Sequence, residues 1–327
     1  MVITRTPFRI SFFGGGTDYP AWYEHNGGGM VINTSIDKYC YVTARHLPPF
    51  FDHKYRIRYT RREERSSVEA IEHPSVRECM KYLDFRDHLE MVHTSDLPAM
   101  AGLGSSSAFT VSFLHSLYGL TKRAITKKEL ALKAIHVEQN LIQENVGSQD
   151  QVASAVGGFN SIVFDHEGVH VTPISISDSK RETLESRLLL FFSGFQRQAS
   201  EIAAEQIRNI PGRTAELTAM MDLTRRARDV LSSGGNLDEF GILMDEGWQL
   251  KKTLSSKITT PQIDDMYAKA KAAGAVGGKL LGAGGGGFMM FYAPEERHPA
   301  IQTALKNFIH VPFHFENTGS QIIYQNT

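Results

Sequence analysis

A segment rich in glycine and serine carries the clearest chemical signal in this sequence. It reads PAMAGLGSSSA from Pro98 to Ala108, and an apolar, helix-like stretch follows it. Glycine lets a backbone approach a ligand closely, and the start of a helix offers unpaired N–H groups and partial positive charge. This combination suits a chain of phosphates, although an N-capped helix after a flexible loop is the simpler alternative. The predicted phosphate-binding residues are Pro98, Gly102, Leu103, Gly104, Ser105, Ser106, Ser107 and Ala108.

The same segment does not have the pattern of the commonest phosphate loop. No Gly-Lys-Ser or Gly-Lys-Thr follows its glycines at the required spacing, so it is not a Walker A loop. Any phosphate bound here must therefore be held by a different loop geometry. One of the serine hydroxyls could cap the helix, and one could also reach a Mg²⁺ ion.

A second glycine-rich segment, RTPFRISFFGGGTDYP, runs from Arg5 to Pro20 and begins as an apolar strand. A carboxylate can accept hydrogen bonds from two sugar hydroxyls, and arginine is a fixed cation. Asp18 is therefore a candidate for binding a sugar, with Arg9 on the same strand. The alternative is an ordinary turn at the end of a strand, capped by Asp18. The predicted substrate-binding residues of this segment are Gly14, Gly15, Gly16, Thr17 and Asp18.

A third segment, KLLGAGGGGFMMF from Lys279 to Phe291, contains the pattern G-x-G-x-x-G. A dinucleotide-binding fingerprint needs a strand before it and a helix after it, whereas a strand is expected to follow here. We therefore reject the dinucleotide interpretation and predict a glycine-packed turn whose backbone lies close to another group. Gly284 and Gly285 are included among the predicted substrate-binding residues, and a tight turn inside a domain is the alternative.

Two carboxylates complete the set of candidates. In the helix expected over residues 126–145, Glu138 falls on the apolar stripe rather than on the solvent-exposed face. A carboxylate in that position needs a partner, such as Mg²⁺ or a basic side chain, and a structural ion pair is the alternative. Asp150 lies in NVGSQDQ, just beyond this helix, where it could be a catalytic base or a plain loop acid.

These residues must be positioned by a mixture of strands and helices. Thr126 and Glu129 form a capping-box pattern at the start of the helix over 126–145, and the sequence over 157–174 predicts a hairpin. Because strands and helices do not alternate strictly, we expect an α+β fold with domains at residues 1–180 and 181–327. The other expected elements are strands at 1–13, 30–45, 188–195 and 288–293, and helices at 105–118, 198–232, 236–254 and 261–273.

Composition narrows the class of protein. The chain has 327 residues, of which 22% are charged, and its formal net charge of -1 lacks the basic excess usual in a nucleic-acid binder. Its two cysteines, Cys40 and Cys79, have no metal-ligand spacing and indicate a reducing compartment. The N-terminal residues do not have the pattern of a signal peptide. No apolar run approaches the roughly 18 residues that a membrane span needs. We expect a cytoplasmic protein without a membrane partner.

The three glycine-rich segments, in this order, resemble those of the GHMP kinase superfamily, and the resemblance covers nearly the whole chain. It implies an N-terminal domain like domain 2 of ribosomal protein S5, a ferredoxin-like C-terminal domain, and an active site between them that uses ATP and Mg²⁺. Ser106 or Ser107 would hold the metal together with Glu138. Asp150 matches the catalytic aspartate of the superfamily, and Arg9 matches the arginine beside it.

The resemblance also indicates a substrate class. Asp18 matches the sugar-binding aspartate of galactokinases, but those enzymes have Glu and His where Gly15 and Gly16 stand here, which argues against galactose. FRISFFGGGTDYPAWY resembles most closely the branch of D-glycero-D-manno-heptose 7-phosphate kinases and related fucokinases. GFQRQASEI also resembles that branch, and Arg197 within it is a candidate for binding a phosphate of the substrate.

The resemblance therefore implies an ATP-dependent kinase that acts on the anomeric hydroxyl of a small-molecule sugar or sugar phosphate. The alternatives are a fucokinase-like or other sugar 1-kinase, a non-catalytic sensor of ATP and sugar, an enzyme of the isoprenoid pathway, and a dehydrogenase. The oligomeric state is open between monomer and homodimer.

Overall fold

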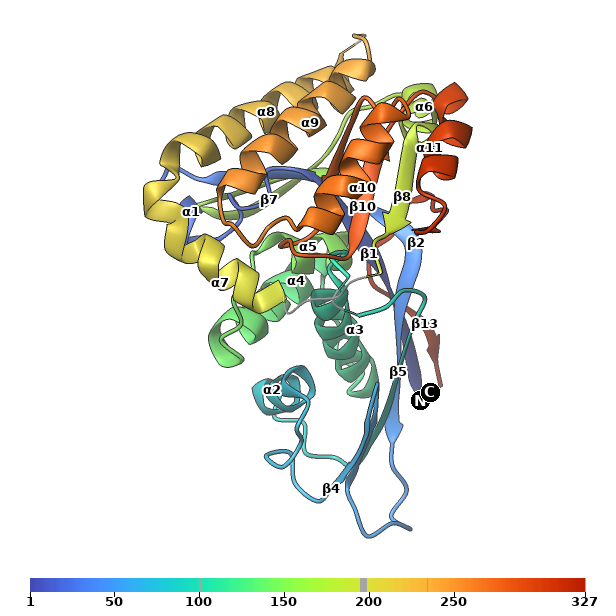
Figure 1. Cartoon of the computed structure of the whole chain (residues 1–327). Helices are drawn as coiled ribbons and strands as arrows, with labels where there is room; N and C mark the ends of the chain where they lie inside the picture. Colours follow the sequence, from blue (N-terminus) through green and yellow to red (C-terminus); the bar gives the residue numbers. More distant parts are fainter. Residues whose placement is uncertain (100, 195–198, 234, 327) are drawn as a thin grey trace.

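The fold is built on two β-sheets, each covered by helices (Figure 1). The structure is a computed structural model that describes residues 1–99, 101–194, 199–233 and 235–326. Within these ranges, nine strands form the first sheet and four antiparallel strands form the second. The first sheet comprises β1 (Val2–Phe13), β2 (Gly29–His46), β3 (Tyr55–Arg58), β4 (Arg62–Arg65), β5 (Leu89–Ser95), β6 (Phe159–Asp165), β7 (Gly168–Pro173), β12 (Phe315–Glu316) and β13 (Gln321–Gln325). The second comprises β8 (Leu188–Phe192), β9 (Gly277–Leu280), β10 (Phe288–Tyr292) and β11 (Ile309–His310).

The long strands β1 and β2 match the strands expected at residues 1–13 and 30–45, and they pair antiparallel at the centre of the first sheet. Nearly every residue of β1 is buried, because elements cover both of its faces. The main path of this sheet has the order β13-β1-β2-β5-β3-β4, with β6 and β12 also paired to β2. The predicted hairpin over 157–174 is confirmed as β6 and β7.

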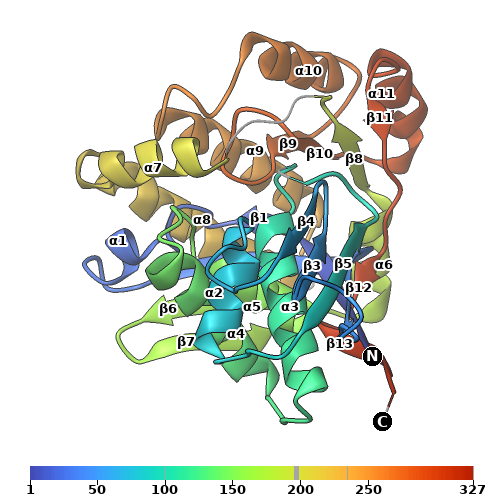
Figure 2. The same cartoon turned by 90° about the horizontal axis from the view of Figure 1, so that it is seen from below.

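Four helices of the N-terminal half, α2, α3, α4 and α5, lie together beside the first sheet (Figures 1 and 2). The central helix α3 packs on β1 and β2, and the predicted capping box of α4 is present. The helix expected over 126–145 ends earlier, because α4 passes into a π-helical turn, Val137–Leu141, before the chain turns at Gln143 with φ of 62°. The described helices of this half are α1 (Pro20–Tyr23), α2 (Pro74–Tyr82), α3 (Ser105–Leu120), α4 (Lys127–His136), α5 (Gln149–Val156) and α6 (Asp178–Ser186).

Of the remaining helices, α9 and α10 pack against β9 of the second sheet, whereas α8 packs against α9 and against β1 and β2 of the first sheet. The single helix expected over 198–232 is wrong: it is divided by a short 3₁₀ turn, Ile210–Gly212, because Pro211 within this turn lacks the N–H that a continuous helix needs. The described helices of this half are α7 (Ala199–Asn209), α8 (Thr214–Ser232), α9 (Asp238–Thr253), α10 (Pro261–Ala272) and α11 (His298–Ala304). No helix in the described ranges is long and apolar enough to cross a membrane.

Two features of the second half were absent from the sequence prediction. Strand β9 leads into the glycines of the third segment and β10 follows them, so these glycines form the turn of a β-hairpin. This agrees with our rejection of the dinucleotide interpretation. The strands β12 and β13 return to the first sheet, where β13 pairs with β1. The two termini consequently lie side by side (Figure 1). The α+β class is confirmed, and the boundary near residue 180 stays a prediction.

Candidate active site

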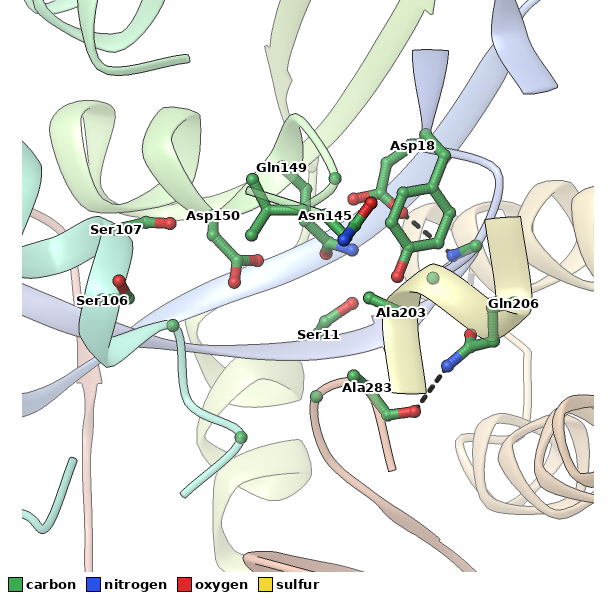
Figure 3. A pocket seen from close by; sticks show the side chains of 18 of the residues that line it. Ser11, Asp18, Ser106, Ser107, Asn145, Gln149, Asp150, Ala203, Gln206 and Ala283 are labelled. Carbon is green, nitrogen blue, oxygen red and sulfur yellow. Dashed lines mark hydrogen bonds between the residues drawn. The ribbon is translucent and has the colours of Figure 1, made fainter. Parts of the chain in front are cut away.

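A cavity of about 410 Å³ is lined by residues from both halves of the chain. Its walls come from the end of β1 and the turn after it, the loop before α3, the segment leading into α5, and α7, α9 and the β9–β10 turn. Figure 3 shows the side chains that converge on this space. The predicted site residues that line it are Arg9, Gly15, Gly16, Asp18, Gly102, Gly104, Ser105, Ser106, Ser107 and Asp150.

Arg9 and Asp150 form a bidentate ion pair at the edge of this cavity. Arg9 donates from Nε to Oδ1 of Asp150 at 2.8 Å and from Nη2 to Oδ2 at 2.7 Å. Its third nitrogen, Nη1, donates to the carbonyl of Gly102 at 2.8 Å. The pair is asymmetric in exposure: the side chain of Arg9 is 4% exposed, whereas that of Asp150 is 26% exposed. The arginine therefore fixes the carboxylate next to the glycine-serine loop and leaves it open to the cavity.

The glycine-serine loop places the start of α3 at the cavity wall. Gly102 and Gly104 have φ of 88° and 74°, a conformation that favours glycine, and Gly104 is the N-cap residue of α3. A Cβ at Gly104 would lie 3.4 Å from Oδ2 of Asp150, so loop and carboxylate are in direct proximity. In Figure 3, Asp150 lies between Ser106 and Ser107 on one side and the group around Asp18 on the other.

The β9–β10 turn supports this loop from the second half of the chain. A Cβ at Gly282 would lie 2.5 Å from the Cα of Gly102, so the two glycine backbones are in close contact. Gly284 and Gly285 lie instead against Ile258: a Cβ at Gly284 would be 2.7 Å from its Cα, and the N–H of Gly285 donates to its carbonyl. These two glycines are not among the described residues that line the cavity.

Three of the predicted phosphate-binding residues are also not among the described residues that line the cavity. Pro98 is exposed, and Leu103 and Ala108 are buried in the hydrophobic core. Arg197 lies outside the described residues.

The turn after β1 presents Asp18 to the cavity. Thr17 donates from Oγ1 to the carbonyls of Gly14 and Met30, at 2.8 and 3.1 Å, which closes the turn. A Cβ at Gly14 would lie 1.9 Å from the carbonyl oxygen of Met30, so this position requires glycine. The N–H of Gly16 donates to Oδ1 of Asp18 at 2.9 Å, and burial raises the pKa of this carboxyl group above its ordinary value. Gly14 and Thr17 thus build the turn, and Asp18 is the side chain that it presents.

Glu138 lies behind the serines, at the π-helical turn. The hydroxyl of Ser107 donates to its Oε2 at 2.7 Å, while its Oε1 is buried and has no hydrogen-bond partner within the described ranges. Burial raises the pKa of Glu138 to about 7. A hydroxyl and a carboxylate oxygen without a partner are suitable donors for Mg²⁺, which prefers oxygen ligands. In the described part of the chain no three His, Cys, Asp or Glu residues are grouped as a metal site, so phosphate and water would have to supply further ligands.

Comparisons with known proteins decide the family. The family models described as GHMP kinases N terminal domain and GHMP kinases C terminal match residues 70–158 and 220–310, which is more than half of the chain. The chain belongs to the GHMP kinase family. It is a phosphotransferase with an alcohol group as acceptor, and the two-domain GHMP kinase fold expected from the sequence is confirmed.

Individual relatives of this GHMP kinase differ in how much of the chain they match. A D-glycero-alpha-D-manno-heptose 7-phosphate kinase from Campylobacter jejuni is 28% identical, with 93% of each chain covered. A mevalonate kinase from Pyrococcus abyssi is 31% identical over 68% of this chain and 64% of its own. Among solved structures, a D-glycero-D-manno-heptose 1-phosphate kinase from Bacteroides thetaiotaomicron superposes with a TM-score of 0.80 at 23% identity, covering 99% and 100% of the two chains.

The cavity of this GHMP kinase also contains polar residues that the sequence interpretation missed. Ser11 and Gln149 are buried, and Oγ of the first and Oε1 of the second have no hydrogen-bond partner in the described chain. Figure 3 shows both side chains at the cavity. Gly147 also lines the cavity, and a Cβ there would lie 1.9 Å from Oδ2 of Asp18. It is a glycine because the carboxylate occupies the space of a side chain.

Two buried lysines from the second half were missed as well. Lys279 of β9 donates to the carbonyls of Ser11 and Phe12 at 2.8 and 2.7 Å, which ties the two sheets together, and burial lowers its pKa well below the ordinary value. Lys251 of α9 donates to the carbonyl of Gly282. The sequence contained a signal for this burial. Lys251 follows Trp248 by three residues and so lies on the same apolar stripe of the helix, which is the argument that placed Glu138 in a buried position.

Proposed function

We propose that this GHMP kinase transfers the γ-phosphoryl group of ATP to the anomeric hydroxyl of D-glycero-D-manno-heptose 7-phosphate, which would yield the 1,7-bisphosphate. The observation that carries the proposal is the placement of Asp150, which lies beside the glycine-serine loop and on the same cavity as Asp18. The heptose 7-phosphate kinase from Campylobacter jejuni, which matches 93% of this chain, supports the choice of acceptor.

The residues at the loop would act mainly by positioning and by neutralising charge, as phosphoryl transfer requires. The N–H groups at the start of α3 would hold the phosphates, and the donors of Arg9 would keep Asp150 in place. Asp150 would accept the proton of the acceptor hydroxyl. Ser106 or Ser107 and Glu138 would hold a Mg²⁺ ion, which when bound neutralises phosphate charge.

The acceptor would occupy the side of the cavity formed by Asp18, Ser11 and Gln149. Oγ of Ser11 and Oε1 of Gln149, which have no partner among the described residues, offer hydrogen bonds to sugar hydroxyls. Asp18 is held in place by the N–H of Gly16. A Cβ at Gly15 would meet only ordinary contacts, at 3.8 and 4.0 Å from Gln149 and Ser11. Glycine at this position therefore leaves room for the sugar where a longer side chain would project.

The proposed role is a step in the synthesis of a nucleotide-activated heptose for a surface polysaccharide, in the cytoplasm. A fucokinase-like or other sugar 1-kinase and a non-catalytic sensor of ATP and sugar stay as alternatives. A mevalonate kinase activity is a further one, because mevalonate kinases match about two thirds of the chain.

The test is an ATP-consumption assay with a panel of acceptors: heptose 7-phosphate, free heptose, fucose, galactose and mevalonate. We expect the highest kcat/KM with heptose 7-phosphate, and a ³¹P NMR spectrum of the product with a new phosphate on the anomeric carbon. Faster turnover of fucose or mevalonate would replace the proposed acceptor. ATP binding without turnover of any acceptor would favour the sensor.

A further inference from the structure

Lys251 is a buried cation that lines the reaction cavity from the second half of the chain. It lies on α9 and is only 6% exposed. Its ammonium group donates to the carbonyl of Gly282, and this is its one hydrogen bond among the described residues. It has no carboxylate within ion-pair distance in the same set of residues. An ammonium group has three donors, so two are left without an acceptor in the described part of the chain.

Two other described cations line the cavity, and their hydrogen bonds to the protein are more complete. Arg9 makes three hydrogen bonds, two to Asp150 and one to Gly102. Lys279 donates to two carbonyl groups of β1. Among the described residues, Lys251 is therefore the cavity cation with the fewest protein partners. Because burying an unpaired charge is costly, a group of this kind is expected to gain its partner from a ligand.

The position of Gly282 indicates which part of a ligand Lys251 would meet. Gly282 is in backbone contact with Gly102 of the glycine-serine loop, and the ammonium group of Lys251 is bonded to the carbonyl of Gly282. Arg9, Asp18 and Asp150 line the same cavity, and their charges act on the ammonium group of Lys251. An anionic oxygen at this point of the cavity would lie between the loop and the acceptor side.

We infer that Lys251 binds a phosphate group within the reaction cavity. The inference rests on the proposed function, in which two phosphates reach this region: the phosphoryl group in transfer and the phosphate already on the acceptor. A lysine ammonium group serves either one, because it is a compact point charge without a fixed geometry.

The test compares Lys251→Met with Lys252→Met. The neighbouring Lys252 lies on the same helix, but its ammonium group lies over the rings of Trp248 and Tyr267, at 5.8 and 5.9 Å, rather than in the cavity. The same charge is removed in both variants, so a difference between them reports on the cavity. Lys251→Gln keeps a donor for Gly282 and replaces Lys251→Met if that variant does not fold.

Kinetics with phosphorylated and free acceptor distinguish the two phosphates. If Lys251 meets the transferred group, kcat falls about 10- to 100-fold with both acceptors. If it meets the phosphate of the acceptor, KM for heptose 7-phosphate rises about 10- to 100-fold, while free heptose is turned over equally by wild type and variant. Kinetic constants equal to those of Lys252→Met with every acceptor would overturn the inference.

Binding measurements keep this test separate from the acceptor proposed above. Calorimetry with ATP, and with inorganic phosphate in the presence of ADP, needs no turnover. We expect Lys251→Met to weaken binding of at least one of these probes about tenfold relative to Lys252→Met. Equal affinities combined with equal kinetics would assign Lys251 to structure, whatever the acceptor is.

Discussion

The carboxylate of Asp18 lies against the backbone of Gly147, so closely that a Cβ at residue 147 would come within 1.9 Å of Oδ2. The contact is reinforced by the backbone, since the N–H of Ser148 donates to the carbonyl of Asp18 at 2.9 Å. It joins the turn after β1 to the segment that leads into Asp150. The carboxylate proposed to bind the acceptor and the proposed base are thus placed by one continuous set of contacts.

We predict that Gly147→Ala displaces Asp18 and weakens acceptor binding. Because a shift of about 1 Å can cost on the order of a hundredfold, we expect kcat/KM for the acceptor to fall by tenfold to a hundredfold while KM for ATP changes little. Steady-state kinetics with each substrate varied in turn measure both constants. Gly212→Ala is the control, because a Cβ there would meet nothing within 4 Å. Equal constants for the two variants would show that Asp18 is not held by this contact.

Gly15 should control how much room the acceptor has. We expect Gly15→Ala to keep activity within about threefold, because its Cβ would make only ordinary contacts. Gly15→Gln would place a long, neutral side chain toward Ser11 and Gln149 and should raise KM for the acceptor more than about tenfold, with KM for ATP unchanged. Acceptor kinetics of the two variants provide the comparison. A Gln variant that binds heptose 7-phosphate normally would place the sugar elsewhere.

Glu138 should set the requirement for Mg²⁺. Glu138→Gln keeps the size of the side chain and its acceptor for Ser107 but removes the charge, so we expect the Mg²⁺ concentration for half-maximal activity to rise about tenfold. A titration of activity with Mg²⁺ at saturating ATP measures this. Glu182→Gln, on the exposed surface of α6, is the control. A Mg²⁺ curve that is the same in both variants would assign Glu138 to structure alone.

Lys251 should give the enzyme a basic pH limit. Burial, followed by the charge of Arg9, lowers the pKa of Lys251 to about 8, while Asp18 and Asp150 raise it. Lys279 is a second buried cation near it, and burial, followed by the charge of Lys251, lowers the pKa of Lys279 well below its ordinary value. Since only the protonated form attracts phosphate, kcat/KM should fall as pH rises through about 8. A bound phosphate favours the protonated form of Lys251 and so raises its pKa. The decline in kcat, which reports on the enzyme with substrates bound, should therefore occur at a higher pH than the decline in kcat/KM.

The variant Lys251→Met provides the check on this pH dependence. Its pH profile of kcat/KM should be lower throughout and should lack the decline near pH 8. Profiles from pH 6 to 10, with stability confirmed by circular dichroism at each end, make the comparison. If the decline near pH 8 persists in Lys251→Met, another group causes it.

Local patterns predicted much of the fold and the site. The capping box at Thr126 and Glu129 is present, because a helix start is defined by residues adjacent in sequence. The loop before α3 could be singled out in the same way, since both its glycines and the helix that follows are local. The apolar stripe of the helix over 126–145 correctly placed Glu138 in a buried position.

The features that were missed depend on contacts between distant segments. Strands β11 and β12 have two residues each, too few for any periodic signal, and β13 is strand-like through its pairing with β1. Gly147 is positioned against Asp18, and Lys279 is hydrogen-bonded to β1. In each case the two partners are more than 100 residues apart in the sequence. Such contacts are determined by tertiary packing, and they cannot be predicted from composition or from the spacing of residues in the sequence.

We propose that Asp150, fixed by Arg9 beside the glycine-serine loop, takes the proton of the acceptor hydroxyl. The most direct test is single-turnover phosphoryl transfer by Asp150→Asn, with ATP affinity measured on the same sample. Asparagine keeps the shape of the side chain but cannot act as the base. We predict that the rate constant of transfer falls on the order of 10² to 10⁴, while ATP affinity stays within about threefold of wild type. Transfer at a rate close to that of the wild type would show that Asp150 is not the base.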